Sequence, residues 1–304
     1  MAQLVWLITG TSTGLGRDLA IAALNRGDKV IATARRRSGS LPQMDSDLEA
    51  KGAETLELDV TEPLDRLHEV ARKAIAFYGR ADVLVNNAGY VLVGAIEEST
   101  PEETYDQFNT NVFGALNVSR AFLPYMRERK TGTIVFVGSL GGWRDIPNAG
   151  LYASTKWAMR GLEVLSYLFW FLTSCLGLSE TLHAEISPLG LRSICIDPGY
   201  FRTSFLSPDH RKSSVTRIPD YRELTEQSEA SLKAHNGKQL GDPQKAAQAT
   251  LNLIHRTEQD KPFPTNIQLG SDCYETAKEH CETALFNLEE WKKVSYSTGF
   301  LKDQ

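Results

Sequence analysis

The segment LVWLITGTSTGLGRDLA, residues 4–20, places an apolar run directly before a glycine-rich turn and an amphipathic stretch. The run 4–9 is typical of a buried β-strand, and the residues after the turn are typical of a helix. Glycines at 10, 14 and 16 suit a tight turn whose backbone approaches a pyrophosphate, which the N–H groups of a helix N-terminus bind. The segment therefore predicts a dinucleotide site, and an ordinary strand-to-helix loop is the alternative.

The alternation of apolar runs and amphipathic stretches continues over the first two hundred residues. The predicted strands are residues 4–9, 29–34, 55–60, 82–87, 133–139 and 191–197, and the predicted helices include 17–26, 63–78 and 101–129. This pattern is typical of βαβ units and of a parallel sheet with helices on both faces. We therefore expect an α/β fold, with one Rossmann-type doubly wound sheet in a single domain over residues 1–304.

Composition limits the classes of partner. The 304 residues carry a formal net charge of −5, which argues against nucleic acid or an anionic membrane, although residues 35–37 are three arginines. We expect a small-molecule partner. The cysteines at 175, 195, 273 and 281 show neither metal-ligand spacing nor a disulfide pattern, which predicts no metal site and a reducing, cytoplasmic location. The first ten residues lack the basic region and cleavage site of a signal peptide.

The second predicted strand ends in ATARRR, residues 32–37, without a carboxylate. NAD sites commonly carry an acidic residue here to bind the ribose 2′-hydroxyl, whereas an arginine binds a 2′-phosphate by paired hydrogen bonds. Arg35 therefore favours NADP(H) over NAD(H), with a solvated basic loop as the alternative. Asp59 and Val60 end the third strand and NNAG, residues 86–89, ends the fourth, at the edge where open α/β sheets bind ligands. Each alone is also typical of a turn.

Ser139, Tyr152 and Lys156 decide the predicted chemistry. Ser139 ends the fifth strand, and Tyr152 lies four residues before Lys156, so that these two share one face of a predicted helix. A phenol with an ordinary pKa of about 10 is a poor base at neutral pH, and a neighbouring ammonium lowers that pKa. The three residues predict a proton donor and acceptor for a carbonyl/alcohol couple.

Together these motifs resemble the short-chain dehydrogenase/reductase family. The sequence around them is similar to that of fungal NADP-dependent members. The resemblance covers about residues 4–203. It rests on the TGxxxGxG turn (9–16), Asp59, NNAG (86–89), Asn111 in NTNVFG, Ser139, the YxxxK pair Tyr152 and Lys156, and PGYFRT (198–203).

The resemblance implies a role for each matching residue. Tyr152 would exchange the proton, Ser139 would bond the substrate oxygen, and Lys156 would hold the nicotinamide ribose. Asn111 would support a water chain behind the lysine. The implied cofactor contacts are Gly10, Ser12, Thr13, Gly14, Leu15, Gly16, Arg35, Asp59, Val60, Asn87, Ala88, Gly89, Arg120, Tyr152, Lys156, Phe201 and Thr203. For Arg120, a surface ion pair is the alternative.

Residues 163–178 interrupt the predicted active-site helix. Gly-Leu occurs at 161–162 and again at 177–178, so that removing the 16 residues restores a family-like continuation. Without them, positions 158, 162, 182 and 186 follow at i+4 steps as one apolar stripe. Sixteen extra helical residues would turn the downstream half by roughly 160°, so the segment must loop out, re-route the helix or disrupt its packing.

Three explanations of the interruption stay open. The first is a retained intron or a faulty gene model. The second is a real insertion that forms an apolar helical hairpin or a surface for a partner. The third is an interfacial membrane segment. A bilayer span is not expected, because the uncharged run 164–179 is shorter than the roughly 20 residues required. In the family this helix commonly packs in a dimer interface, so the interruption leaves a homo-oligomer in doubt.

The sequence thus predicts an NADP(H)-dependent oxidoreductase that interconverts a ketone or aldehyde and an alcohol by hydride transfer. A catalytically silent cofactor-binding protein of the same fold is the alternative. Residues 206–240 predict a substrate lid and residues 271–304 a C-terminal extension. Trp143, Tyr200, Phe205 and Leu206 predict an apolar pocket wall. A place in secondary metabolism follows by analogy alone, and the substrate and physiological direction are not readable.

Overall fold

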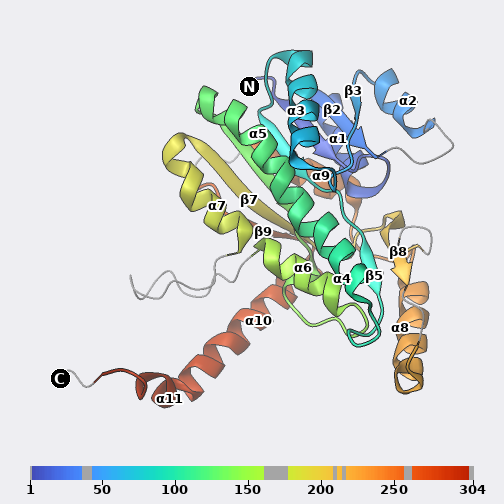
Figure 1. The fold of residues 1–304 in the computed structure, drawn as a ribbon, viewed down its shortest axis with the longest axis vertical. Helices are drawn as coiled ribbons and strands as arrows, with labels where there is room; N and C mark the ends of the chain where they lie inside the picture. Colours follow the sequence, from blue (N-terminus) through green and yellow to red (C-terminus); the bar gives the residue numbers. More distant parts are fainter. Residues whose placement is uncertain are drawn as a thin grey trace.

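The computed structural model describes residues 2–35, 43–160, 177–207, 211–213, 217–256 and 262–300. Seven parallel strands form one sheet in the order β3-β2-β1-β4-β6-β7-β9 (Figure 1). They are β1 (Val5–Thr9), β2 (Lys29–Ala34), β3 (Glu54–Glu57), β4 (Val83–Asn86), β6 (Gly132–Val137), β7 (Leu191–Pro198) and β9 (Asn266–Leu269). The strand order reverses between β1 and β4, the kind of point at which open α/β sheets bind ligands. The predicted doubly wound Rossmann-type fold is confirmed.

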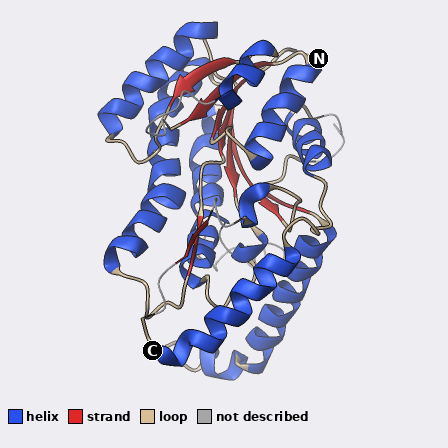
Figure 2. Ribbon diagram, turned by 90° about the vertical axis from the view of Figure 1, so that its right-hand side faces the viewer, coloured by secondary structure: helices blue, strands red, loops and turns tan. Residues whose placement is uncertain are grey.

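Helices cover both faces of the sheet (Figure 2). One face packs α1 (Gly14–Arg26), α2 (Gln43–Ala50) and α9 (Pro243–Ile254); the other packs α3 (Leu64–Tyr78), α5 (Ala115–Arg129), α6 (Gly150–Arg160) and α7 (Leu178–Ile186). Alternate residues of β1 serve the two cores, with Trp6 and Ile8 in one and Val5 and Leu7 in the other. Burial on both sides explains why β1 reads as a continuous apolar run.

Several elements differ from the predicted pattern. β3 ends at Glu57, so the predicted strand 55–60 is too long. Leu58 still donates its N–H to Ala34 O of β2, and the side chains of Leu58 and Val60 pack into the core. β9 was not predicted, since its four residues are only half buried and give a weak pattern. A separate two-stranded sheet, β5 (Val91–Val93) with β8 (Arg211–Ser213), joins segments far apart in the chain. Long-range pairing of this kind leaves no local signal.

The predicted helix 101–129 is continuous but not uniform. It consists of α4 (Pro101–Phe108), a π-helical segment η1 (Asn109–Gly114) and α5. Thr100 caps the start through a capping box, in which its hydroxyl accepts from Glu103 N and Glu103 accepts from Thr100 N. Single π-helical turns inside α-helices occur frequently at functional sites, and this one contains Asn111.

The helix that carries Tyr152 and Lys156 is described up to Arg160, and α7 begins at Leu178. Met159 of α6 and Leu182 and Ile186 of α7 are buried in the same core cluster. The residues after the predicted interruption therefore contribute to the same core as those before it. Nearly all of the interruption predicted at 163–178 lies outside the described residues.

The segment 206–240, predicted as a lid, contains β8, η6 (Pro219–Tyr221) and α8 (Arg222–His235) within its described part. Its main anchor is the buried Glu98, whose carboxylate accepts hydrogen bonds from the backbone N–H groups of Arg217 (2.7 Å) and Ile218 (2.9 Å). Arg211 of β8 forms a two-point ion pair with Glu229 of α8. These contacts hold the segment against the β5 side of the domain.

The chain ends in two helices that extend away from the sheet (Figure 1), α10 (Ser271–Glu290) and α11 (Lys292–Tyr296). The start of α10 packs on the body through Cys273 and Ala277, which are buried with Trp143. They fall within the predicted C-terminal extension 271–304. In the described part of the chain, each helix is too short or too polar to cross a bilayer.

Candidate active site

The glycine-rich turn after β1 adopts a conformation that side chains would disturb. Gly10 and Gly14 have φ angles of +69° and +63°, in the region that glycine tolerates best. At Gly16 the backbone itself is ordinary, but a Cβ would collide with Asn87 Nδ2 and lie 2.8 Å from Gly10 O. The turn therefore keeps an open backbone surface above the start of α1, as a pyrophosphate cradle requires.

Two of the predicted cofactor motifs meet at this turn. Asn87 Nδ2, from NNAG, donates to the carbonyl oxygens of Thr9 (2.8 Å) and Gly10 (3.0 Å). In return, Thr9 Oγ1 accepts from the backbone N–H groups of Asn87 and Ala88, both at 2.9 Å. The ends of β1 and β4 are thus cross-linked at the switch point of the sheet.

The N-terminus of α1 is left available to an anion. Thr13 is the N-cap residue, yet its side chain forms no capping hydrogen bond, and the first turn carries no acidic residue. A helix N-terminus of this kind attracts negative charge through its N–H groups and dipole. Thr203 lies close by, with its Cβ 3.8 Å from the position that a Cβ at Gly14 would take. The loop PGYFRT is thereby brought close to the turn. The predicted contact of Thr203 with the nicotinamide end of a cofactor stays a prediction.

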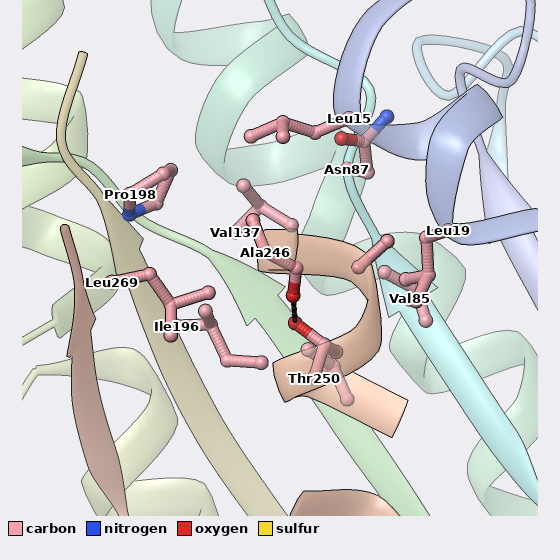
Figure 3. A pocket seen from close by; sticks show the side chains of 12 residues that line it. Leu15, Leu19, Val85, Asn87, Val137, Ile196, Pro198, Ala246, Thr250 and Leu269 are labelled. Atoms are coloured by element: carbon pink, nitrogen blue, oxygen red, sulfur yellow. Dashed lines mark hydrogen bonds between the residues drawn. The ribbon is translucent and has the colours of Figure 1, made fainter. Parts of the chain in front are cut away.

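A cavity of about 40 Å³ lies beneath the turn, between the sheet and α9 (Figure 3). Leu15, Asn87 and Pro198 line it near the carboxyl ends of the strands, and Thr250 lines it from α9. Its volume accommodates only water-sized molecules. The cavity therefore belongs to the floor of the cradle rather than to a substrate pocket.

The predicted chemical group is assembled at the carboxyl ends of β6 and β7. Tyr152 and Lys156 lie on one face of α6, with Lys156 Nζ 5.7 Å from the centroid of the Tyr152 ring. Ser139 follows β6 and hydrogen-bonds with the Tyr152 side chain. Lys156 Nζ donates to Val137 O at 2.7 Å, which fixes the ammonium beside the strand end. The structure thus brings Ser139, Tyr152 and Lys156 together.

Burial controls the titration of both groups. It raises the pKa of Tyr152 to about 12, since the hydrogen bond with Ser139 offsets only part of the desolvation and nearby Tyr200 and Asp197 add to the rise. Burial also lowers the pKa of Lys156 to about 8, against the opposing influence of Cys195 and Asp197. The pKa of Tyr152 is therefore raised, not lowered as expected from the neighbouring ammonium, because loss of hydration dominates. The phenol is held protonated at neutral pH.

Asn111 is buried within the π-helical segment η1 and its side chain is used for structure. Its Nδ2 donates to Tyr90 O (3.0 Å) and Thr155 Oγ1 (3.1 Å), and its Oδ1 accepts from Tyr90 N (3.1 Å). Asn111 therefore ties the residue after NNAG to α6, one position before Lys156. The predicted water chain behind Lys156 stays a prediction.

Apolar side chains cover the catalytic phenol. Phe205 lies beside Tyr152 with ring centroids 6.1 Å apart, and Leu232 of α8 packs on the cluster formed by Tyr152, Val91 and Val93. Tyr152 is only 6% exposed as a result. Of the predicted pocket wall, Phe205 meets the phenol, while Trp143 and Tyr200 pack with the start of α10.

The remaining predicted cofactor residues lie in several settings, from the surface to the core. Arg35 directly follows β2, and its charge acts on the phenol of Tyr90. Asp59 accepts from Thr61 N and Oγ1. Phe201 forms a backbone bridge with Gly241. Ser12 lies in the glycine-rich turn and Gly89 in the loop after β4, whereas Val60 is buried. Arg120 lies on the exposed face of α5 and donates a hydrogen bond to Asn117 Oδ1 at 2.8 Å.

Sequence reasoning missed Asp197, which is fully buried at the end of β7. Its carboxylate accepts from Ser139 N (3.1 Å), Trp143 Nε1 (2.9 Å) and Asn266 Nδ2 (2.8 Å). The sequence feature that could have indicated Asp197 is its position directly before Pro198-Gly199, at the carboxyl end of a buried strand. An aspartate there also reads as a turn residue, which is why the motif alone did not single it out.

The parallel sheet, the glycine-rich turn at its switch point and the grouping of Ser139, Tyr152 and Lys156 beside it define a protein of the Rossmann-type class. Residues 4–165 match the short chain dehydrogenase family, and the chain belongs to that family.

Two relatives align with this chain over most of their length. The chain is 30% identical to oxidoreductase BOA17 of Botryotinia fuckeliana over 97% of this chain and 99% of that protein. It is 32% identical to 3-ketodihydrosphingosine reductase of Bacteroides thetaiotaomicron over 88% of both. Among solved structures, a short-chain dehydrogenase from Streptomyces avermitilis superposes with a TM-score of 0.80 at 37% identity, covering 98% of this chain and 99% of that one.

Proposed function

We propose that the protein is an NADP(H)-dependent oxidoreductase that interconverts a ketone or aldehyde and the corresponding alcohol. The observation that carries this proposal is the meeting of Ser139, Tyr152 and Lys156 beside the glycine-rich cradle. Family membership supports the reaction type, and the site geometry supports the assignment of roles. A fold of this kind alone would support many functions.

The residues present fit a dinucleotide. A Cβ at Gly10 or Gly16 would press on Asn87, so that only glycine lets the turn pack this closely, and the first turn of α1 offers its N–H groups with no competing carboxylate. Arg35, at the end of β2, is positioned to favour a 2′-phosphate, since a guanidinium binds phosphate by two parallel hydrogen bonds. When bound, the nicotinamide supplies or accepts the hydride. Lys156 and Asn87 would hold its ribose groups.

In the reductive direction, Ser139 and Tyr152 act on the carbonyl oxygen of the substrate. The Ser139 hydroxyl donates a hydrogen bond to that oxygen, and Tyr152 transfers its phenolic proton to it as the hydride reaches the carbon. A pKa of about 12 keeps Tyr152 protonated at neutral pH, which suits a proton donor. Lys156, with a pKa near 8, is still largely charged at pH 7 and stabilises the phenolate that remains.

The cover over Tyr152 supports an apolar substrate. Phe205, Leu232, Val91 and Val93 surround the phenol, and a site of this composition selects apolar groups next to the reacting carbonyl. The relative named 3-ketodihydrosphingosine reductase is consistent with a ketone on an aliphatic chain. A role in the cytoplasm and in secondary metabolism stays a prediction.

The decisive experiment measures NADPH binding and NADPH oxidation separately. Purified protein should bind NADPH more tightly than NADH and oxidise it with members of a panel of apolar ketones. Tyr152→Phe should bind NADPH like the wild type and lose turnover by at least about a hundredfold. Tight NADPH binding without turnover on any carbonyl would instead identify a catalytically silent cofactor-binding protein. Absence of both binding and turnover would refute the proposal.

A further inference from the structure

A buried carboxylate stands directly behind the proposed site. Asp197 is 0% exposed at the end of β7, and it accepts hydrogen bonds from Ser139 N, Trp143 Nε1 and Asn266 Nδ2. Cys195 Sγ also lies 3.4 Å from its Oδ1 as a fourth donor. A backbone amide and an indole can only donate, so this set of partners suits an ionised carboxylate.

The surrounding chain is shaped to admit this carboxylate. A Cβ at Gly138 would collide with Asp197 Oδ1, so the residue between β6 and Ser139 leaves its side-chain volume to Asp197. Oδ1 then reaches Ser139 N, at the N-cap of the short helix η2 (Leu140–Gly142), while Ser139 Oγ accepts from Gly141 N. Asp197 thereby fixes the backbone from which the Ser139 hydroxyl projects toward Tyr152.

The same carboxylate acts electrostatically on both proton-bearing groups of the site. Its charge raises the pKa of Tyr152 and that of Lys156. The other titratable groups that face this pair are Tyr200, after β7, and Cys195, within β7. The elements on the far side, β5, η4 (Ser204–Leu206) and α8, contribute apolar Val91, Phe205 and Leu232.

We infer that Asp197 is a positioning residue of the reductase site. It holds Ser139 in the orientation that bonds the substrate oxygen, and its buried charge keeps Tyr152 as the proton donor and Lys156 as the ammonium. This inference rests on the proposed function and adds to it a charged residue that acts through Ser139, Tyr152 and Lys156 without touching substrate.

The chain provides a matched control in Asp28, another buried carboxylate. Asp28 Oδ2 accepts from Trp6 Nε1 at 2.9 Å, the same distance as between Asp197 and Trp143, and it also contacts His255 Nε2 at 2.7 Å. Asp28 lies just before β2, at the amino edge of the sheet, whereas Asp197 lies at the carboxyl edge. Replacing either by asparagine removes one buried charge bonded to an indole, but only one of them is near the site.

The first test compares the pH dependence of ketone reduction in the wild type, Asp197→Asn and Asp28→Asn. Removing the charge of Asp197 lowers the pKa of both Tyr152 and Lys156. The alkaline limb of kcat should therefore move to lower pH, by roughly one unit, and kcat should fall by about tenfold or more. Asp28→Asn should reduce thermal stability and leave the limb in place. If the alkaline limb lies at the same pH in both variants, the inference is overturned, because a residue with a purely structural role does not move this limb.

Asp197→Ser is a smaller neutral replacement if the asparagine variant does not fold, and it should move the limb in the same direction. Asp197→Glu keeps the charge but displaces it, so it should lower kcat while its alkaline limb stays near that of the wild type. If the alkaline limb of Asp197→Glu also moves to lower pH, the shift depends on the position of the side chain rather than on its charge. This result would overturn the electrostatic role of Asp197.

A second readout does not depend on turnover. Tyrosinate formation is followed by absorbance during a pH titration of each protein with and without the additional substitution Tyr152→Phe. The difference between the two curves isolates the ionisation of Tyr152. This residue should ionise at lower pH in the Asp197→Asn background than in the wild type. If the wild type reduces no ketone, the proposed function fails, and this titration still decides the inference about the charge of Asp197. An unchanged Tyr152 ionisation would overturn it.

Discussion

Thr9 accepts two hydrogen bonds from Asn87 and one from Ala88 across the switch point of the sheet. Thr9 O accepts from Asn87 Nδ2 at 2.8 Å, and Thr9 Oγ1 accepts from the backbone N–H groups of Asn87 and Ala88, both at 2.9 Å. The glycine-rich turn is therefore held in place by the motif that ends β4. A cradle fixed before the cofactor arrives loses little conformational entropy on binding.

The first prediction concerns Gly16→Ala. A Cβ there collides with Asn87 Nδ2, so the variant must break the link between the two motifs. Overpacking of this kind costs about 1–3 kcal/mol, and the Kd for NADPH should rise by at least about tenfold. Isothermal titration calorimetry with NADPH measures the change.

Gly52→Ala is the control for this variant. Gly52 has a φ of +94° and no atom near its absent Cβ, so the substitution strains the backbone without closing the cradle. It should lower the Tm by a few degrees and leave the Kd for NADPH unchanged. Equal effects of both variants on the Kd would contradict a steric role for Gly16.

The second prediction is that Lys156→Met stabilises the fold while it abolishes turnover. Burial lowers the pKa of Lys156 from 10.5 to about 8, so the folded protein holds its proton less tightly than the unfolded chain does. This penalty is complete below pH 8 and disappears above pH 10.5. Lys156→Met should therefore be more stable by roughly 2 kcal/mol at pH 7 in urea unfolding, and its advantage should shrink between pH 8 and 10.5. A variant less stable than the wild type at pH 7 would show that the Val137 hydrogen bond outweighs desolvation.

The third prediction concerns cofactor choice. Arg35→Asp removes the guanidinium that follows β2 and introduces the carboxylate that commonly binds a ribose 2′-hydroxyl at this place. A hydrogen bond to a charged group contributes about 1.5–3 kcal/mol, so the Kd for NADPH should rise by about 10- to 100-fold while that for NADH falls. Arg72→Asp, on the exposed face of α3, makes the same charge change away from the site and should leave the NADPH/NADH ratio unaltered. A ratio unchanged in Arg35→Asp would point to NADP(H) selection elsewhere.

The fourth prediction concerns the anchor of the segment 206–240. Glu98→Ala leaves the N–H groups of Arg217 and Ile218 without their carboxylate acceptor. Local opening should become easier by about 1–3 kcal/mol, which trypsin cleavage after Arg217 detects, and KM should rise because Tyr152 loses part of its cover. Glu97→Ala removes only the exposed bond to Tyr221 and should have a smaller effect on both. Cleavage as slow as in the wild type would exclude Glu98 as the anchor.

Much of the site was predictable because its residues occur at strand ends or at helical spacing. Gly10, Gly14 and Gly16 follow the first apolar run, and the four-residue interval between Tyr152 and Lys156 places them on one face of α6. Asp197 was not predictable in this way. Its partners come from two segments that lie 54 to 69 residues away in the chain, Ser139 and Trp143 at the ends of η2 and Asn266 on β9.

The sequence by itself determined the parallel sheet, the glycine-rich turn and the placement of Tyr152 and Lys156 on one helix face, because period, glycine placement and i+4 spacing act over a few residues. Only the tertiary structure decided how those residues titrate and what surrounds them. Burial sets the pKa values of Tyr152 and Lys156 in directions that local spacing did not predict. The pairing of β5 with β8, the cover by Phe205 and Leu232, and the carboxylate of Asp197 behind Ser139 all depend on contacts between distant segments, which form only when the chain is packed.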